Sequence, residues 1–279
     1  MIGVFAKRDL LGIAELALPG VDVGDGQVVS GDFHDVVLLP GRAVVKVARG
    51  TAAAHLPRRV ELLRRLAEMG LPFATPVPLS DVVAVGDRRA VALSWVVGED
   101  CPAGTGDPAE LRRLLAALAE VPVDELAACL DRPHAYAGRD AWPELMLDEV
   151  VPRLPPCARQ EARRRIGAAL DLPPVPATLV HGDLAGQNVR WNADGTLAGV
   201  IDWDLAQAFD PAIDAACLAW HGWEAVRAAV DAQTYERART WFLTFGIEQV
   251  AAVIDNGEPA SVIEACVVRA ARWIEETSD

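Results

Sequence analysis

Two short motifs in the C-terminal half carry side chains that can bind a metal ion and accept a proton. The sequence HGDLAGQN covers residues 181–188, and IDWD covers residues 201–204. Asp183 and Asn188 lie five residues apart, and Asp202 follows 14 residues after Asn188. A loop followed by a hairpin can bring these two carboxylates and the amide oxygen to one point. Oxygen ligands of this kind suit Mg²⁺, which commonly keeps several waters and is shared with substrate phosphates.

A lysine in a valine-rich segment predicts contact with a small anion. The chain contains two lysines, Lys7 and Lys46, against 24 arginines. An ammonium group is a compact point charge on a flexible stem, whereas a guanidinium group is wide and planar. Lys46 therefore indicates a position that requires the smaller cation, with a strand-edge lysine as the alternative.

The elements before residue 99 are predicted to form a small β-rich lobe. Residues 27–48 contain two β-branched runs around the turn residues Pro40 and Gly41, and residues 81–98 contain two more around Gly86 and Asp87. Between these hairpins, residues 57–70 carry apolar side chains at helical spacing.

After Gly98 the sequence is predicted to be mostly helical. Asp107 and Pro108 are an N-cap and a first-turn proline for a helix that ends near Glu120. The turn sequence NADG, residues 192–195, predicts one hairpin among the helices. Further helices are expected over roughly 140–150, 157–170 and several stretches after 210. The sequence thus predicts an α+β fold with a small antiparallel sheet lobe at 1–93, a hinge at 94–98 and a larger, mostly helical lobe at 99–279.

The charge of the chain is uneven. The net charge is −14; residues 1–93 hold 11 Lys/Arg and 10 Asp/Glu, and residues 94–279 hold 15 Lys/Arg and 30 Asp/Glu. The acidic part disfavours nucleic acid and anionic membranes and attracts cations, with solubility as the alternative explanation. The sequence contains no run of about 18 apolar residues, so no membrane span is expected. Five scattered cysteines without a C-x-x-C pair favour a reducing, cytoplasmic location.

HGDLAGQN followed by IDWD resembles the aminoglycoside phosphotransferase family of small-molecule kinases, which have a bilobal, protein-kinase-like fold. The family pattern is H-G-D-x-x-x-x-N followed by I-D-[WFY]-[DE], and the resemblance covers nearly the whole chain. It implies that Asp183 is the catalytic base for an acceptor hydroxyl and that His181 supports its loop. It also implies that Asn188 and Asp202 hold Mg²⁺. The spacing from Asp183 to Asn188 is the one in the catalytic loop of protein kinases, where the Asp accepts the hydroxyl proton and the Asn holds metal.

The resemblance further implies that the N-terminal lobe binds a nucleotide. Lys46 would contact the α- and β-phosphates, with Glu61 as its ion-pair partner. The alternative for Glu61 is a pair with Arg64 or Arg65 on its own helix.

The segment LSWVVG, residues 93–98, resembles the hinge of such kinases. In that position the Ser94 carbonyl and the Val96 amide would bond the adenine edge, and His34 is a candidate nucleotide contact from its loop. Two features of protein kinases are missing: a G-x-G-x-x-G sequence before Lys46 and an A-P-E segment. Protein substrates are therefore not expected.

These features imply an ATP- or GTP-dependent O-phosphotransferase that acts on a hydroxyl of a small, cationic molecule. The viomycin and capreomycin branch of the family is similar to this chain in three segments, residues 33–38, 52–80 and 181–192. An antibiotic acceptor and antibiotic resistance are therefore expected, with a sugar or amino alcohol as the alternative. Two other classes stay open. One is a metal-dependent hydrolase that uses His181, Asp183, Asp202 and Asp204 as a metal cluster, and the other is a nucleotide-binding module without transfer activity.

Several residues near the motifs have structural interpretations. Asp210 and Pro211 are predicted as an N-cap and a first-turn proline, whereas Asp214 fits a structural role and a place near the substrate equally well. Trp142 and Trp223 are candidates for a wall of the acceptor site, and Trp220 is expected in the core. Residues 163–165, three arginines, are expected to form a solvated helix face.

Overall fold

A computed structural model of the chain describes residues 7–31 and 34–278, which divide into two compact units. Unit 1 comprises the chain up to Cys101 together with residues 124–130 and 187–203; unit 2 comprises residues 102–123, 131–186 and the chain from Asp204 onward. The sequence-based boundaries put residues 124–130 and 187–203 in the second lobe, whereas the structure groups them with unit 1.

Unit 1 is built on a five-stranded antiparallel sheet in the order β1-β2-β3-β5-β4. Two hairpins, β2–β3 and β4–β5, form around the turn residues that the sequence indicated. The strands are β1 (Gln27–Ser30), β2 (His34–Leu39), β3 (Ala43–Ala48), β4 (Val83–Val85) and β5 (Arg88–Ser94).

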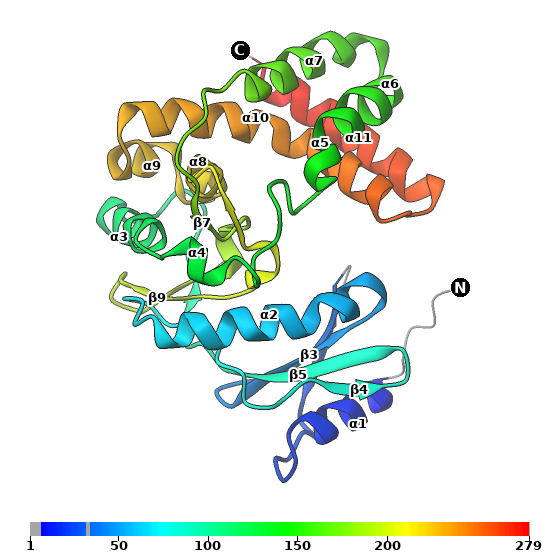
Figure 1. Cartoon of the computed structure of the whole chain (residues 1–279), viewed down its shortest axis with the longest axis vertical. Helices are drawn as coiled ribbons and strands as arrows, with labels where there is room; N and C mark the ends of the chain where they lie inside the picture. The colour runs from blue at the N-terminus through cyan, green and yellow to red at the C-terminus, as the bar shows by residue number, and fades with distance from the viewer. Residues whose placement is uncertain (1–6, 32–33, 279) are drawn as a thin grey trace. The chain divides into compact units, whose positions relative to one another are not determined.

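One helix covers each face of this sheet, α1 (Lys7–Ala17) and α2 (Gly50–Glu68) (Figure 1). Val45 and Val47 of β3 belong to the buried cluster that α1 closes. Because side chains alternate along a strand, Lys46 lies on the opposite face of the sheet, which α2 covers. The central strand thus carries the lysine on the side that faces away from the α1 core.

Helix α2 begins seven residues before the segment predicted from residues 57–70. Ala52, Ala53 and Leu56 are buried and continue its apolar face toward the N-terminus at helical spacing. Pro57 therefore lies inside the helix, although a proline there removes one backbone hydrogen bond.

A second, three-stranded sheet of unit 1 carries the predicted NADG hairpin. It has the order β6-β8-β9 and consists of β6 (Glu99–Asp100), β8 (Val189–Trp191) and β9 (Leu197–Val200). The Ala74 amide donates to Ala198 O at 2.9 Å, and the Val200 amide donates to Ala74 O at 2.9 Å. Gly199 permits this approach, because a Cβ there would lie 2.4 Å from Val96 Cγ1 and 2.7 Å from Ala74 O.

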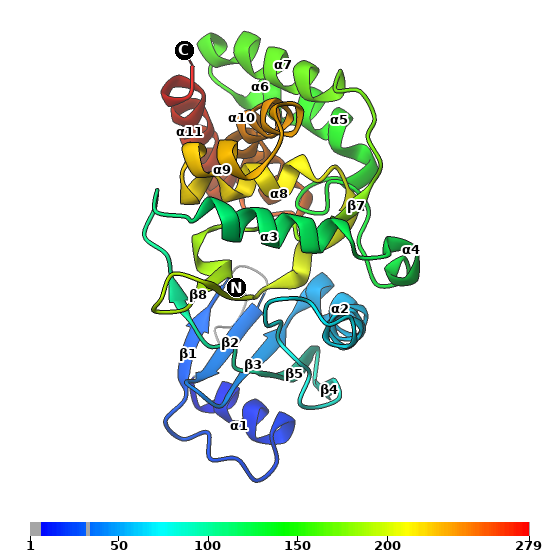
Figure 2. The same ribbon diagram turned by 90° about the vertical axis from the view of Figure 1, so that its left-hand side faces the viewer.

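Unit 2 is mostly helical, as the sequence predicted. Helix α10 packs against α7, α8 and α11 (Figure 2). Asp107 caps α3 by accepting hydrogen bonds from the Ala109 and Glu110 amides at 2.8 and 3.1 Å. The α-helices are α3 (Pro108–Ala119), α5 (Trp142–Glu144), α6 (Val151–Arg153), α7 (Pro156–Leu170), α8 (Ala212–Cys217), α9 (Trp223–Ala229), α10 (Ala232–Asp255) and α11 (Ala260–Glu276). The short α4 (Val123–Leu126) belongs to unit 1 except for Val123. Unit 2 also has a two-stranded sheet of β7 (Thr178–Val180) and β10 (Gln207–Phe209).

In the described part of the chain, residues 7–31 and 34–278, no helix combines the length and apolar character that a membrane span requires. All five cysteines lie in this part, and each is a free thiol.

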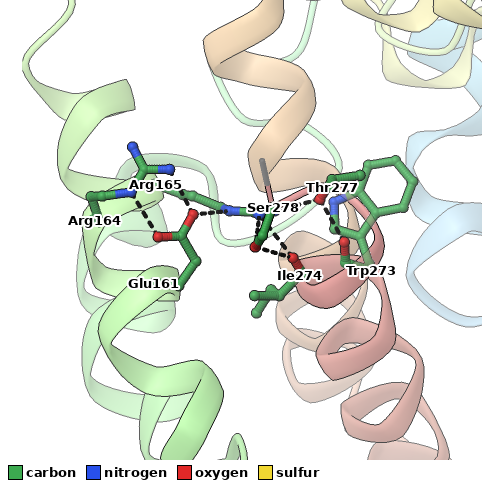
Figure 3. Close-up of polar contacts among 7 residues, drawn as sticks. All are labelled: Glu161, Arg164, Arg165, Trp273, Ile274, Thr277 and Ser278. Atoms are coloured by element: carbon green, nitrogen blue, oxygen red, sulfur yellow. Dashed lines mark hydrogen bonds and ion pairs between the residues drawn. The ribbon is translucent and has the colours of Figure 1, made fainter.

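The expectation that residues 163–165 form a solvated face is wrong for Arg165. This side chain is 1% exposed and connects α7 with the end of α11 (Figure 3). Its guanidinium donates to Glu161 Oε1 at 2.8 Å, Thr277 Oγ1 at 2.7 Å, Ile274 O at 3.0 Å and Ser278 Oγ at 3.1 Å. Hydrogen bonds from Arg164 and Arg165 lower the pKa of Glu161 to about 2, although partial burial acts to raise it.

Replacing Arg165 by alanine is expected to destabilise unit 2. The change removes the guanidinium's hydrogen bonds to Glu161, Thr277, Ile274 and Ser278. Each hydrogen bond of a charged group contributes about 1.5 to 3 kcal/mol, whereas Glu161 keeps its ion pair with Arg164. Urea unfolding of Arg165→Ala and of Arg163→Ala measures the difference, since Arg163 is an exposed neighbour on the same helix. Equal stability of the two variants would contradict this role for Arg165.

Candidate active site

Asp183 lies in a loop of unit 2 whose backbone is held at three consecutive positions. The loop, residues 181–183, follows strand β7. The His181 amide donates to Asp214 Oδ2 at 2.8 Å, and the Gly182 amide donates to Asp214 Oδ1 at 2.9 Å. The Asp183 amide donates to His181 Nδ1 at 3.2 Å. Each backbone N–H of the loop therefore has an acceptor, which fixes the position from which the Asp183 side chain starts.

His181 contacts the loop through its ring. Its side chain is fully buried. A ring nitrogen that accepts a hydrogen bond carries no proton, so neutral His181 has its proton on Nε2. The geometry thus gives His181 a contact through which it can support Asp183, rather than a position to meet a substrate.

Asp214 holds the loop from helix α8. Its side chain is 1% exposed, and burial raises its pKa to about 7 against the opposing effect of the Gly182 and His181 amides. One turn later on α8, the Cys217 thiol donates to the Gly182 carbonyl oxygen, with sulfur and oxygen 3.8 Å apart. A carboxylate within the apolar stretch AIDAAC was the sequence signal for this buried role, which the sequence alone left undecided.

Asp210 has a structural role, although Pro211 and not Asp210 is the N-cap of α8. It is buried, and its carboxylate accepts hydrogen bonds from the Ala212 amide at 3.0 Å and from Trp241 Nε1 at 2.8 Å. It also forms an ion pair with Arg237 on α10. Asp210 therefore ties the start of α8 to α10.

Lys46 and Asp202 form an ion pair in unit 1. The Nζ of Lys46 lies 2.7 Å from Asp202 Oδ1. Asp202 has a backbone φ of 63°, in the left-handed region that non-glycine residues rarely adopt. Such conformations cost free energy and concentrate at functional sites.

Asn188 lies beside Asp202 at one end of the β8–β9 hairpin. Val189 pairs with Val200, and the Ile201 amide donates to Asn188 O at 2.9 Å. Residues that are 14 positions apart in the sequence are therefore neighbours across two strands.

The donor chemistry of this end of the hairpin fits Mg²⁺. Asn188 supplies an amide oxygen, and the carboxylate of Asp202 already bonds a cation, the ammonium of Lys46. Mg²⁺ usually binds to one or two protein carboxylates together with waters and substrate phosphates. Within the part of the chain that the structure describes, no group of three or more His, Cys, Asp or Glu side chains is placed to hold a metal.

The carboxylate of Glu61 does not take the partner expected from the resemblance. Its Oε1 lies 2.9 Å from Arg65 Nε, one turn further along α2. The structure thus shows the alternative in which Glu61 pairs within its own helix, because residues at i and i+4 meet on one face. Lys46 instead bonds Asp202.

The three remaining candidate nucleotide contacts lie in or beside the five-stranded sheet. Ser94 ends β5. Its amide donates to Val77 O, and its hydroxyl oxygen accepts from the Val77 amide, each at 2.8 Å. Val96 is buried, with its side chain against Gly199. His34 is also buried and is the first residue of β2, paired with Ala48, so it lies in the sheet and not in an open loop.

Trp142 is a core residue, so its assignment to a substrate wall is wrong. It is 0% exposed, stacks on His134 with ring centroids 4.5 Å apart, and donates from Nε1 to Glu248 Oε1 at 2.7 Å. Burial raises the pKa of Glu248 to about 7, against the opposing effect of that hydrogen bond. Trp223 is half-buried against the rings of Tyr235 and Phe242.

Comparison with known proteins gives one consistent result. The model of the phosphotransferase enzyme family matches residues 25–253. The chain is 33% identical over 262 residues to a viomycin phosphotransferase from Streptomyces vinaceus, covering 87% of this chain and 90% of that protein.

Solved structures show the same fold. The GDP complex of aminoglycoside 2'-phosphotransferase-IIIa superposes with a TM-score of 0.80 at 18% identity, covering 98% of this chain and all of the other. The streptomycin–ATP ternary complex of APH(2″)-IIa gives a TM-score of 0.69 at 18% identity, covering 97% of each chain.

Replacing Asp214 by asparagine is expected to loosen the loop of residues 181–183. Asparagine offers one acceptor oxygen where two amides need partners, and a lost hydrogen bond of about 1 kcal/mol corresponds to roughly fivefold faster local opening. Hydrogen–deuterium exchange of peptides that cover residues 178–186 measures this. Glu248→Gln is the control, since Glu248 is also a buried carboxylate of unit 2 but bonds Trp142 and not the loop; equal exchange in both variants would contradict the assignment.

Replacing Glu248 by glutamine is expected to stabilise the protein increasingly as the pH rises. The folded-state pKa of Glu248 is raised from 4.5 to about 7, so its contribution to stability is complete below about pH 4.5 and is lost as the pH rises through 7. The difference amounts to a few kcal/mol at most, since one pKa unit corresponds to about 1.4 kcal/mol.

Urea unfolding at pH 5 and pH 8 tests this expectation. Glu236→Gln, on the exposed side of the same helix, is expected to differ little from the wild type at either pH. A Glu248→Gln variant whose gain is the same at both values would show that burial of the charge is not the cause.

Proposed function

Because the chain belongs to the phosphotransferase enzyme family, we propose that it transfers a phosphoryl group from ATP or GTP to a hydroxyl of a small, cationic molecule. Three hydrogen bonds support this proposal, because they fix the backbone of the loop from which the Asp183 side chain extends. Phosphoryl transfer depends mainly on positioning and on electrostatic stabilisation. A carboxylate that starts from a fixed backbone is suited to orient an acceptor hydroxyl.

In the proposed reaction, Asp183 accepts a hydrogen bond from the acceptor hydroxyl and takes its proton. The hydroxyl oxygen forms a bond to the γ-phosphorus while the bond from that phosphorus to the bridging oxygen of the β-phosphate breaks. The nucleoside diphosphate leaves with the bonding electrons, and the phosphorylated acceptor remains. His181 and Asp214 act on this step only by holding the Asp183 backbone.

The groups of unit 1 are proposed to bind the nucleotide phosphates. Lys46 would exchange its bond to Asp202 for contacts with phosphate oxygens, which the flexible lysine stem allows. Asn188 and Asp202 would hold Mg²⁺, which neutralises charge on the phosphates when it is bound. Ser94, Val96 and His34 stay proposals for the nucleoside, although the burial of His34 leaves it little surface for such a contact.

We propose a cationic antibiotic of the viomycin and capreomycin type or an aminoglycoside as the acceptor, with resistance as the consequence. Residues 94–279 hold 30 acidic and 15 basic side chains, a balance that attracts cations. A relative that is 33% identical is named for its action on viomycin, which favours the first type.

The geometry of His181 argues against the metal-dependent hydrolase. That reading needs His181 as a metal ligand, but the residue is fully buried and its Nδ1 accepts the Asp183 amide. It also leaves Lys46 without a function.

Replacing Asp183 by asparagine is expected to abolish transfer and to keep nucleotide affinity within about threefold. Asparagine preserves the shape but cannot take the hydroxyl proton, and loss of a positioned base costs about 100-fold or more in rate. Release of nucleoside diphosphate in the presence of an acceptor measures transfer, and calorimetry measures binding. Near-normal turnover of Asp183→Asn would disprove the role of Asp183.

Replacing Lys46 by alanine is expected to have the complementary effect and to weaken nucleotide binding about tenfold or more, since a charge-assisted contact with phosphate is lost. Lys7→Ala is the matched control, because it removes the other lysine of the chain, which is exposed on α1. Equal nucleotide affinities of the two variants would exclude Lys46 from the phosphate site.

A further inference from the structure

Trp220 differs from the other tryptophans of the chain in its exposure. All eight tryptophans lie in the described residues, and only Trp220 has an exposed side chain, at 51%. This corrects the expectation that it belongs to the core. Its neighbours Leu218 and His221 are fully buried, so the short helical turn that carries Trp220 is anchored while the indole is presented to solvent.

The backbone of this turn is fixed by a second segment of unit 2. The Gly104 amide donates to the Trp220 carbonyl oxygen, and the Gly106 amide donates to the His221 carbonyl oxygen, both at 2.9 Å. The exposed indole therefore projects from a rigid support. A rigid aromatic surface loses little conformational freedom when a ligand binds to it.

The indole also lies directly against the loop that follows Asp183. A Cβ built on Gly186 would lie 2.1 Å from Trp220 Nε1 and 2.5 Å from Cε2. Only a glycine permits this contact, and Gly186 is three residues after Asp183. The exposed ring is thus fixed beside the segment that carries the proposed base.

On this basis, and resting on the proposed function, we propose that Trp220 is a platform on which a cationic group of the acceptor lies, so that it determines acceptor specificity. A Lys-like ammonium or a planar guanidinium is attracted to the negative face of an aromatic ring, and indole is the strongest of the aromatic side chains in this respect. The acidic composition of this part of the chain favours the same ligand charge.

The test compares Trp220→Phe and Trp220→Leu in steady-state transfer to a cationic acceptor. Trp220→Leu keeps an apolar side chain without a π face, and the KM for the acceptor is expected to rise about five- to thirtyfold, with a smaller rise for Trp220→Phe. The KM for the nucleotide is the internal reference. Tyr136→Leu, which removes another exposed aromatic residue of unit 2, is expected to leave the acceptor KM unchanged.

Gly186→Ala supplies a second, independent variant, because its added methyl group must displace the indole. It is expected to raise the acceptor KM in the wild-type background and to add little in the Trp220→Leu background, where the obstructing ring is gone. Additive effects of the two substitutions would contradict the proposed contact.

Three outcomes separate the inference from the function on which it rests. Transfer by the wild type with an acceptor KM that Trp220→Leu does not change would overturn the platform alone. Equal KM values for the Phe and Leu variants would also overturn it, since packing and not the π face would then bind the acceptor. Absence of transfer by the wild type to any cationic acceptor, with nucleotide bound, would overturn the proposed function and the platform together.

Discussion

The buried carboxylate of Asp214 is the constraint on which the candidate site of unit 2 depends. Its two oxygens accept the consecutive amides of His181 and Gly182, and a buried polar group without such partners would be costly. The same bonds that satisfy Asp214 therefore determine where the backbone of Asp183 lies. Helix α8 adds the Cys217 thiol, and Asp210 anchors the start of that helix to α10. The loop that carries Asp183 is thus held by side chains of packed helices.

In unit 1, one face of the five-stranded sheet is apolar and the opposite face carries a charged side chain. Strand alternation puts Lys46 opposite the α1 core, and the β8–β9 hairpin brings Asp202 to its ammonium at 2.7 Å. Gly199 lets this hairpin approach Ala74 closely enough for two backbone hydrogen bonds. The surrounding structure maintains the left-handed backbone of Asp202, a conformation that concentrates at functional sites.

Local sequence signals predicted the elements well and the long-range contacts poorly. The hairpin turns, the Asp107 cap and the helical character of unit 2 follow from turn chemistry and apolar spacing, which act over a few residues. The spacing of Asp183, Asn188 and Asp202 predicted a shared site, and their roles stay predictions. The sequence did not show that Glu61 pairs with Arg65 or that Arg165 is buried. Those outcomes depend on which helices pack together. The exposure of Trp220 was not predicted for the same reason, since hydrophobicity alone favours a place in the core.

We propose that this chain phosphorylates a hydroxyl of a small, cationic acceptor. Mass spectrometry of viomycin, capreomycin and several aminoglycosides after incubation with the protein, Mg²⁺ and ATP or GTP tests it most directly. We expect one or more compounds to gain the mass of a single phosphoryl group, in amounts equal to the nucleoside diphosphate formed. Consumption of nucleotide, or hydrolysis without nucleotide, with no mass gain on any acceptor would contradict it.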